Sequence, residues 1–223
     1  MKKPVIGVLL HGSGAKDGSE IHESVFTMAA LEMAGATVKC IAPKGPQHRV
    51  CNHFTGDEVE ISRDMLEESA RIARGEVVPL DSVGPNSIDG LVIPGGFGTA
   101  YNLCSFAEKG IDMDVRPDVT QLLRSLHEMK KPIGAICIAP VLLAKLFGNE
   151  KPKITLGGPG DVATAAEKMG VVHVVAKSSE SVTDEALGFV STPAYMHDVS
   201  VSEIFPGIQK LANEMVRLVS KRR

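Results

Sequence analysis

The sequence lacks a disulfide framework, a long apolar run and a large excess of charge of either sign. Its four cysteines are widely spaced with no CxxC pair, and 223 residues are enough to fold without disulfides, so a reducing compartment is expected. The net charge of −3 arises from 24 basic and 27 acidic residues that are interspersed, which indicates no surface for nucleic acid. No stretch approaches the roughly 18 apolar residues that suggest a membrane span.

The amino-terminal residues do not read as a secretory signal. The apolar segment PVIGVLL at 4–10 is short, and His11, Gly12, Ser13 and Gly14 interrupt it where a cleavable segment would continue. We therefore expect a cytoplasmic protein without a membrane partner.

Signals for a metal or nucleotide cofactor are also missing. His48, Cys51 and His53 lie close together in the sequence, but their spacing matches no zinc motif and no second pair of ligands follows. The glycine-rich segment PGGFG at 94–98 is followed by no GK[ST] and does not fit a dinucleotide fingerprint. The sequence therefore predicts no metal and no cofactor.

Apolar strands alternate with helices along the whole chain, which has no internal repeat or dividing linker. Nearly continuous apolar strands favour a parallel sheet covered on both faces, so we expect one α/β domain over 1–223. The first helix should bury a stripe of Ile21, Val25, Met28 and Leu31. Strands are predicted at 4–10, 37–42, 88–93, 133–136, 153–156 and 171–175, with a hairpin at 181–192. Helices are predicted at 19–34, after Ser62, at 139–147, at 161–169 with Asp161 as its cap, and after a capping box of Ser200 and Glu203, with Pro206 kinking this last helix or delaying its start. A further helix should start at Pro117 and end at Lys130 and Lys131, with a core stripe of Val119, Leu122, Leu126 and Met129.

Cys137 is the most informative single residue, because a short apolar strand stops at it and an apolar helix follows at once. Such a turn lifts the side chain above the sheet edge and points the sulfur at the positive end of the helix dipole, which favours the thiolate. An isolated cysteine in an apolar segment is more often a small core residue. The neighbouring loops favour the reactive interpretation.

Three loops should meet at the rim formed by the carboxyl ends of the parallel strands, where ligands of such sheets collect. They are HGSG at 11–14, PGGFG at 94–98 and the Cys137 turn. A thiolate that attacks a carbonyl needs donors for the oxygen that becomes negative, and the amides of Gly96 and Ile138 are our candidates. Gly95 and Gly12 are further candidates for contact with the substrate. An ordinary tight turn is the alternative for PGGFG.

The sequence contains DGLVIPGGFG, then GAICIAP, then STPA, and it has a glutamate in the first helix. This combination resembles the PfpI superfamily over nearly the whole chain. The resemblance implies a class I glutamine amidotransferase-like domain, a flavodoxin-like three-layer sandwich with a cysteine nucleophile elbow, and a homodimer, since relatives are often dimers. Other stretches are GSEIHESV, FTGDEVEISRDMLEESARIARGE and STPAYM. They resemble one branch of the superfamily, the ElbB branch, whose members are described as amidotransferase-like proteins with glyoxalase activity.

The resemblance places the family's nucleophile on Cys137 and its acidic partner on Glu23, about twelve residues before the pair Ala34 and Gly35. Glu20 is the main competitor, and a solvated carboxylate near a helix amino terminus is the alternative for both. Hydrolase members carry a histidine directly after the nucleophile, where this chain has Ile138, so peptidase activity is not expected. The remaining histidines considered, which we expect to be structural or exposed, are His11, His22 and His197.

The resemblance to the ElbB branch implies a glyoxalase, and our hypothesis is that it needs no cofactor and acts on a small carbonyl substrate. Cys137 would add to the aldehyde of glyoxal or methylglyoxal, and Glu23 would move the protons that lead to glycolate or lactate. Glutamine hydrolysis is one alternative and would need a histidine, such as His197, at the Cys137 sulfur. A redox sensor that uses reversible oxidation of Cys137 is another. Three roles are open for the segment 43–60, namely a lid over the site, an interface with another subunit, or a surface loop.

Overall fold

A seven-stranded sheet forms the centre of the protein in the computed structural model, which describes residues 3–222. The strand order is β3-β2-β1-β4-β5-β9-β8, and all neighbours are parallel except the antiparallel pair β8 and β9. These strands are β1 (Val5–Leu9), β2 (Thr37–Ala42), β3 (Val77–Pro79), β4 (Gly90–Ile93), β5 (Ile133–Ile136), β8 (Val182–Asp184) and β9 (Phe189–Thr192). The predicted α/β fold with a mainly parallel sheet is therefore confirmed.

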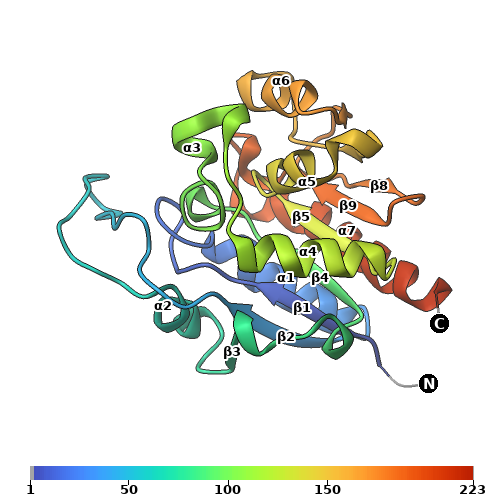
Figure 1. Ribbon diagram of the computed structural model, residues 1–223, viewed down its shortest axis with the longest axis horizontal. Coiled ribbons are helices and arrows are strands. Elements are labelled where there is room, and N and C mark those ends of the chain that lie inside the picture. The colour runs from blue at the N-terminus through green and yellow to red at the C-terminus, as the bar shows by residue number, and fades with distance from the viewer. Residues whose placement is uncertain (1–2, 223) are drawn as a thin grey trace.

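Helices cover both faces of the sheet, which makes three layers (Figure 1). On one face, α1 (Ile21–Met33), α2 (Met65–Ile72) and α7 (Val201–Lys221) enclose one apolar core. On the other face, α4 (Pro117–Glu128), α5 (Pro140–Phe147) and α6 (Asp161–Lys168) enclose a second core. The short helix α3 (Phe106–Lys109) and the two-stranded ribbon of β6 (Lys153–Ile154) and β7 (Val172–His173) complete the arrangement. Within residues 3–222, no helix is both long and apolar enough to cross a bilayer.

The direction of strand addition reverses at β1, which has β2 on one side and β4 on the other. A parallel sheet opens a crevice at such a switch point beyond the carboxyl ends of its strands. The segments after β1, β4 and β5 therefore meet at one rim, as the sequence predicted.

The first helix presents a different face to the core from the predicted stripe. Ile21 and Val25 are 44% and 43% exposed, whereas Glu23, Thr27 and Leu31 are buried. The prediction for Ile21 and Val25 was wrong because the helix is turned so that a carboxylate, not an aliphatic residue, faces the rim of the sheet. The cost of burying Glu23 is offset by hydrogen bonds that the functional site supplies.

Several element ends also differ from the predictions. The cap of α2 is Asp64, not Ser62, because the Asp64 side chain accepts hydrogen bonds from the amides of Leu66 and Glu67. β3 was missed because a three-residue strand offers no periodicity to detect. Helix α6 starts at Asp161, with Gly160 in the cap position, and Met129 is an exposed cap of α4 instead of a core residue.

The carboxyl-terminal third matches the predictions closely. The hairpin of β8 and β9 and the capping box of Ser200 and Glu203 are both present. Pro206 lies inside α7 without delaying its start at Val201. Proline cannot donate a backbone hydrogen bond, and the burial of an apolar stripe of α7 compensates for this loss. The residues of the stripe are Ile204, Ile208, Leu211, Met215 and Leu218.

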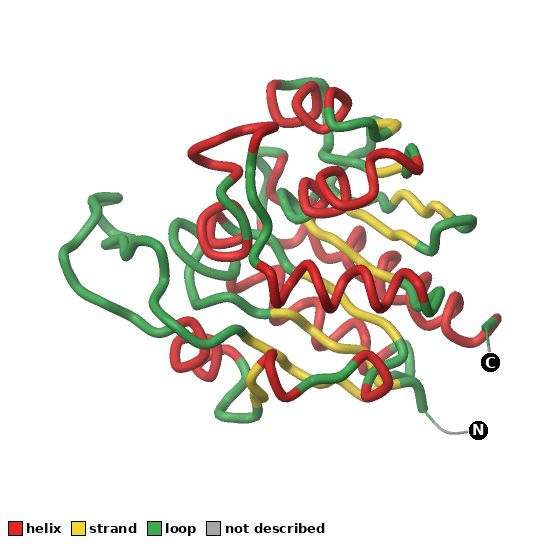
Figure 2. Tube along the Cα trace, viewed as in Figure 1, coloured by secondary structure: helices red, strands yellow, loops and turns green. Residues whose placement is uncertain are grey.

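The segment 43–60 forms part of a long loop between β2 and α2 that extends away from the body of the protein (Figure 2). Phe54 within it is 98% exposed. The base of the loop is anchored, because the Cys51 amide donates to the Asp17 carboxylate at 2.7 Å and the His48 amide donates to Asn102 Oδ1 at 2.8 Å. These contacts tie the loop to the segments that follow β1 and β4.

Candidate active site

Cys137 occupies a sharp turn directly after β5, with a left-handed backbone whose φ is 60°. This conformation is unfavourable for any residue with a Cβ and is held by its surroundings: the Cys137 amide donates to Thr192 O at 2.9 Å, and α5 starts at Pro140. The residue is 9% exposed. A strained cysteine between a buried strand and a helix is the nucleophile-elbow arrangement that the sequence predicts.

Glu23 reaches this turn from α1 and is fully buried. Its Oε2 accepts a hydrogen bond from the Gly95 amide at 2.8 Å, and its Oε1 accepts one from the Tyr195 amide at 3.4 Å. The carboxyl also shares a hydrogen bond with the Cys137 side chain. The structure thus brings together the two residues predicted as nucleophile and acidic partner.

Two adjacent glycines make this close approach possible. A Cβ on Gly95 would lie 2.5 Å from Cys137 Cβ and 2.7 Å from Glu23 Oε2. Gly96 has a φ of 96°, and its amide donates to the Cys137 sulfur together with the amide of Ile138. The structure therefore places the predicted oxyanion donors, Gly96 and Ile138, on either side of the sulfur, while Gly95 holds Glu23 instead of contacting the pocket.

Burial dominates the electrostatics of the pair. It raises the pKa of Glu23 to about 8, and the nearby charge of Glu20 adds to the shift. Burial and the Glu23 carboxylate also raise the pKa of the Cys137 thiol, although the amides of Gly96 and Ile138 lower it. The predicted stabilisation of the thiolate by the helix dipole is outweighed by these effects. Glu23 therefore loses its proton before the Cys137 thiol does.

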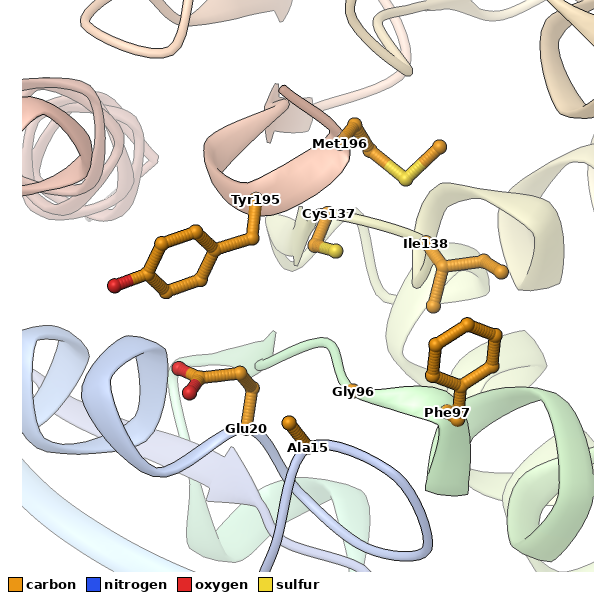
Figure 3. A pocket seen from close by; sticks show the side chains of 8 residues that line it. All are labelled: Ala15, Glu20, Gly96, Phe97, Cys137, Ile138, Tyr195 and Met196. Carbon is orange, nitrogen blue, oxygen red and sulfur yellow. The ribbon is translucent and has the colours of Figure 1, made fainter. Parts of the chain in front are cut away.

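A pocket of about 150 Å³ opens in front of the Cys137 sulfur (Figure 3). Sites for drug-sized ligands occupy about 300–1,000 Å³, so this pocket suits a smaller molecule or one that extends into solvent. Most of the wall is apolar, and the lining residues are Ala15, Glu20, Gly96, Phe97, Cys137, Ile138, Tyr195 and Met196.

None of the three candidate histidines makes a hydrogen bond to Cys137 among the described residues. His197 Nε2 pairs with Ala176 O at 2.9 Å, and His22 is exposed with Nδ1 2.9 Å from the Tyr195 hydroxyl. His11 is buried beside Thr99, and burial lowers its pKa to about 4, so it stays neutral. A cysteine–histidine pair is therefore absent from the described site.

Gly12 does not lie at the pocket, unlike the other predicted glycines. Its amide donates to Ser69 Oγ at 2.9 Å, and a Cβ on it would lie 2.8 Å from Gln47 Oε1. The loop after β1 makes a turn at this point, so Ala15 reaches the pocket instead. No group of three or more metal-ligating His, Cys, Asp or Glu side chains is found within residues 3–222.

Sequence reasoning missed part of the pocket wall. Tyr195 and Met196 line it, and Ala194 before them has a positive φ of 42° that turns the Tyr195 amide toward Glu23. The string STPAYM marks this segment, but neither periodicity nor spacing indicates its conformation. Phe97 was missed because it lies inside a loop in which only the glycines were considered.

A three-layer α/β fold with a strained cysteine after a central strand defines the class of flavodoxin-like proteins with a cysteine elbow. Residues 14–187 match the DJ-1/PfpI family, and the chain belongs to that family. It is 37% identical to the rat "ES1 protein homolog, mitochondrial" and 36% identical to the human "Glutamine amidotransferase-like class 1 domain-containing protein 3, mitochondrial". Each match covers 97% of this chain and 84% of the relative.

A solved structure of similar sequence shares the whole fold. The isoprenoid biosynthesis protein with amidotransferase-like domain from Ehrlichia chaffeensis is 36% identical, with a TM-score of 0.89. The match covers 96% of this chain and 99% of that chain. The coarse prediction, an amidotransferase-like member of the PfpI superfamily, is therefore confirmed.

The predicted cytoplasmic location is contradicted by these relatives. The rat and human proteins are both named as mitochondrial and align with nearly the whole chain. The prediction rested on reduced cysteines and on the lack of a secretory signal, and neither property distinguishes one reducing compartment from another.

Proposed function

We propose that this protein is a cofactor-independent glyoxalase that converts small 2-oxoaldehydes into 2-hydroxy acids, and that it belongs to the ElbB-like branch of its family. The hydrogen-bonded pair of Cys137 and Glu23, with two amides at the sulfur and a small pocket in front of it, supports the activity. The 36% identity to the amidotransferase-like protein of Ehrlichia chaffeensis supports the branch.

The first step forms a hemithioacetal. Cys137 Sγ bonds to the aldehyde carbon, the electron pair of the broken C=O π bond moves onto oxygen, and the proton shared by Cys137 and Glu23 passes to that oxygen. The amides of Gly96 and Ile138, which donate to Sγ, are close enough to hold the developing oxyanion. A preorganised pair of backbone donors lowers this barrier without reorganisation.

The second step moves a hydrogen between the two substrate carbons. The Glu23 carboxylate removes the proton from the carbon bonded to sulfur, which gives an enediolate, and returns a proton to the neighbouring carbon. The hydroxyl proton of the first carbon passes to the neighbouring oxygen as the thioester carbonyl forms. The product is a thioester of glycolate or lactate. A pKa of about 8 suits this work, because a general base acts best when its pKa lies near the working pH.

Hydrolysis completes the cycle. One water molecule cleaves the bond between sulfur and the acyl carbon, the Cys137 thiol is regenerated, and the hydroxy acid leaves. The overall reaction consumes one water molecule and requires no electron carrier, because the aldehyde is oxidised while the neighbouring carbonyl is reduced.

Solvent deuterium tests the enediol step. In D2O, lactate formed from methylglyoxal should carry deuterium at its second carbon, because Glu23 exchanges its proton with solvent. Glu23→Gln should reduce turnover by about 10²-fold or more, which is typical of a lost acid–base group. Lactate that retains the full complement of substrate hydrogen, together with an undiminished rate in Glu23→Gln, would indicate a direct hydride shift and would contradict the role of Glu23.

Redox sensing is a second candidate, supported by the same environment. The two amides and the Glu23 carboxyl would stabilise an oxygen added to the Cys137 sulfur. Mass spectrometry after mild peroxide treatment tests this function. Selective oxidation of Cys137 together with negligible aldehyde turnover would favour sensing, whereas rapid turnover would favour catalysis. Glutamine hydrolysis lacks comparable support, because no described histidine is bonded to Cys137.

A further inference from the structure

Glu20 gives the pocket a charge that the proposed mechanism does not use. It is the only carboxylate among the eight residues that line the pocket, and no lysine or arginine is among them. Figure 3 shows its carboxylate on one side of the pocket, with Phe97 and Ile138 on the other. The pocket thus has one acidic end and one apolar end.

The position of the Glu20 carboxylate is fixed by the amino terminus of α1. Its Oε2 accepts a hydrogen bond from the Glu23 amide at 2.7 Å, and its own amide donates to Gly95 O at 2.9 Å. Its Oε1 lies 3.7 Å from Nδ1 of the exposed His22, which itself pairs with the Tyr195 hydroxyl at 2.9 Å. The carboxylate is therefore held at the pocket by the same helix end that presents Glu23.

The negative charge has no lysine or arginine partner among the residues that line the pocket, and the exposed His22 and the buried Glu23 carboxyl lie near it. The amides of Gly96 and Ile138 serve the developing oxyanion at Cys137, and the lining offers no cationic side chain to a second anionic group on a substrate. At an effective dielectric near 20, two like charges about 5–10 Å apart repel strongly enough to change an equilibrium about tenfold or more. A carboxylate or phosphate on the substrate would face this repulsion.

We propose that Glu20 determines specificity by excluding anionic substrates, so that the Cys137 pocket accepts uncharged carbonyl compounds whose substituent packs against Phe97 and Ile138. The proposal rests on the proposed function for the identity of the reaction. It also explains how the product would leave, because a neutral aldehyde becomes a carboxylate beside Glu20 and is then repelled.

Alkylation tests the charge of the pocket without requiring any turnover. Iodoacetamide and iodoacetate are nearly equal in size and differ in charge, so the ratio of their rates at Cys137, divided by the same ratio for N-acetylcysteine, measures the field at the sulfur. We expect the wild type to favour the neutral reagent about tenfold or more at pH 7, where Glu23, with a pKa of about 8, is mostly protonated and Glu20 supplies the charge. Glu20→Gln should remove most of this preference, and it can still accept the hydrogen bond from the Glu23 amide.

Glu32→Gln is the matched control, because Glu32 is exposed at the other end of α1 and its loss removes the same charge. Its rate ratio should equal that of the wild type. A wild type without preference for the neutral reagent, or a Glu20→Gln protein that keeps the full preference, would overturn the proposal. Thermal unfolding of each variant verifies that the fold is intact.

A second measurement separates this proposal from the proposed function. Phenylglyoxal and 4-carboxyphenylglyoxal should differ in kcat/KM by about tenfold or more in the wild type, and the difference should shrink in Glu20→Gln. If neither compound is converted but alkylation still depends on Glu20, the glyoxalase function fails and the charge selection stands. If both are converted equally well by the wild type, the charge selection fails and the function stands.

Discussion

The Glu23 carboxyl accepts a hydrogen bond at 2.8 Å from the amide of Gly95, a residue 72 positions further along the chain. This contact joins α1 to the loop after β4 and holds the carboxyl against the Cys137 side chain. It is possible only because Gly95 has no Cβ, since that atom would lie 2.7 Å from Glu23 Oε2. A buried acid, a glycine and a strained cysteine thus form one unit.

Replacing Gly95 with alanine should disrupt this unit. The added methyl group would lie 2.5 Å from Cys137 Cβ, so backbone or side chains must shift at a cost of about 1–3 kcal/mol in unfolding free energy. Aldehyde turnover should fall by at least about tenfold. Gly84→Ala is the control, because a Cβ there meets no atom within 4 Å. Comparable activity of the two variants would show that the close approach is unimportant.

Glu23 should make the fold less stable as the pH rises. Its pKa is about 8 in the folded protein and near 4.5 in an unfolded chain, so the folded state binds the extra proton between these values. Its contribution to stability is complete below about pH 4.5 and is lost as the pH rises to about 8. Each pH unit within that window is worth about 1.4 kcal/mol for a fully coupled group.

Chemical denaturation of the wild type and Glu23→Gln at several pH values measures this contribution. Glutamine does not titrate, so the stability of the variant relative to the wild type should increase between about pH 5 and pH 8 and then level off. A difference that does not change with pH would mean that Glu23 titrates normally in the folded protein. Cys137 does not interfere, because its pKa is raised out of this window.

The histidine His197 should be dispensable for aldehyde turnover. Its Nε2 pairs with Ala176 O at 2.9 Å and it does not line the pocket at Cys137. His197→Gln should therefore keep kcat within about threefold of the wild-type value. A loss of 10²-fold or more, with an intact fold by circular dichroism, would instead indicate that His197 acts as a general base, as a glutaminase triad requires.

Much of the fold was readable from the sequence because its signals are local. The strands at 37–42 and 133–136 have the predicted bounds, since each ends in apolar residues that are buried in the parallel sheet. The first helix was found at nearly the predicted place, but its buried face was not, because that face carries the polar residues Glu23, Ser24 and Thr27, which an apolar periodicity does not detect. At Glu23, the placement of a carboxyl beside Cys137 takes precedence over an apolar helix face.

The site was readable only in part. Cys137, Gly96 and Ile138 were found because each belongs to a turn at the end of a strand, where backbone amides and the nucleophile follow from topology. Tyr195 depends on the conformation of Ala194, whose φ of 42° no pattern of residue types indicates. The displacement of Gly12 from the pocket likewise depends on contacts with Gln47 from a loop far along the chain.

The central claim, that Cys137 is the nucleophile of a glyoxalase, is tested most directly by measuring lactate formation from methylglyoxal with purified wild type, Cys137→Ser and Cys40→Ala. Cys40 is a buried cysteine on β2 outside the pocket, so its loss controls for removing a thiol. The account predicts that the wild type and Cys40→Ala form lactate at similar rates and that Cys137→Ser forms none above the uncatalysed rate. Wild-type turnover by Cys137→Ser would contradict it.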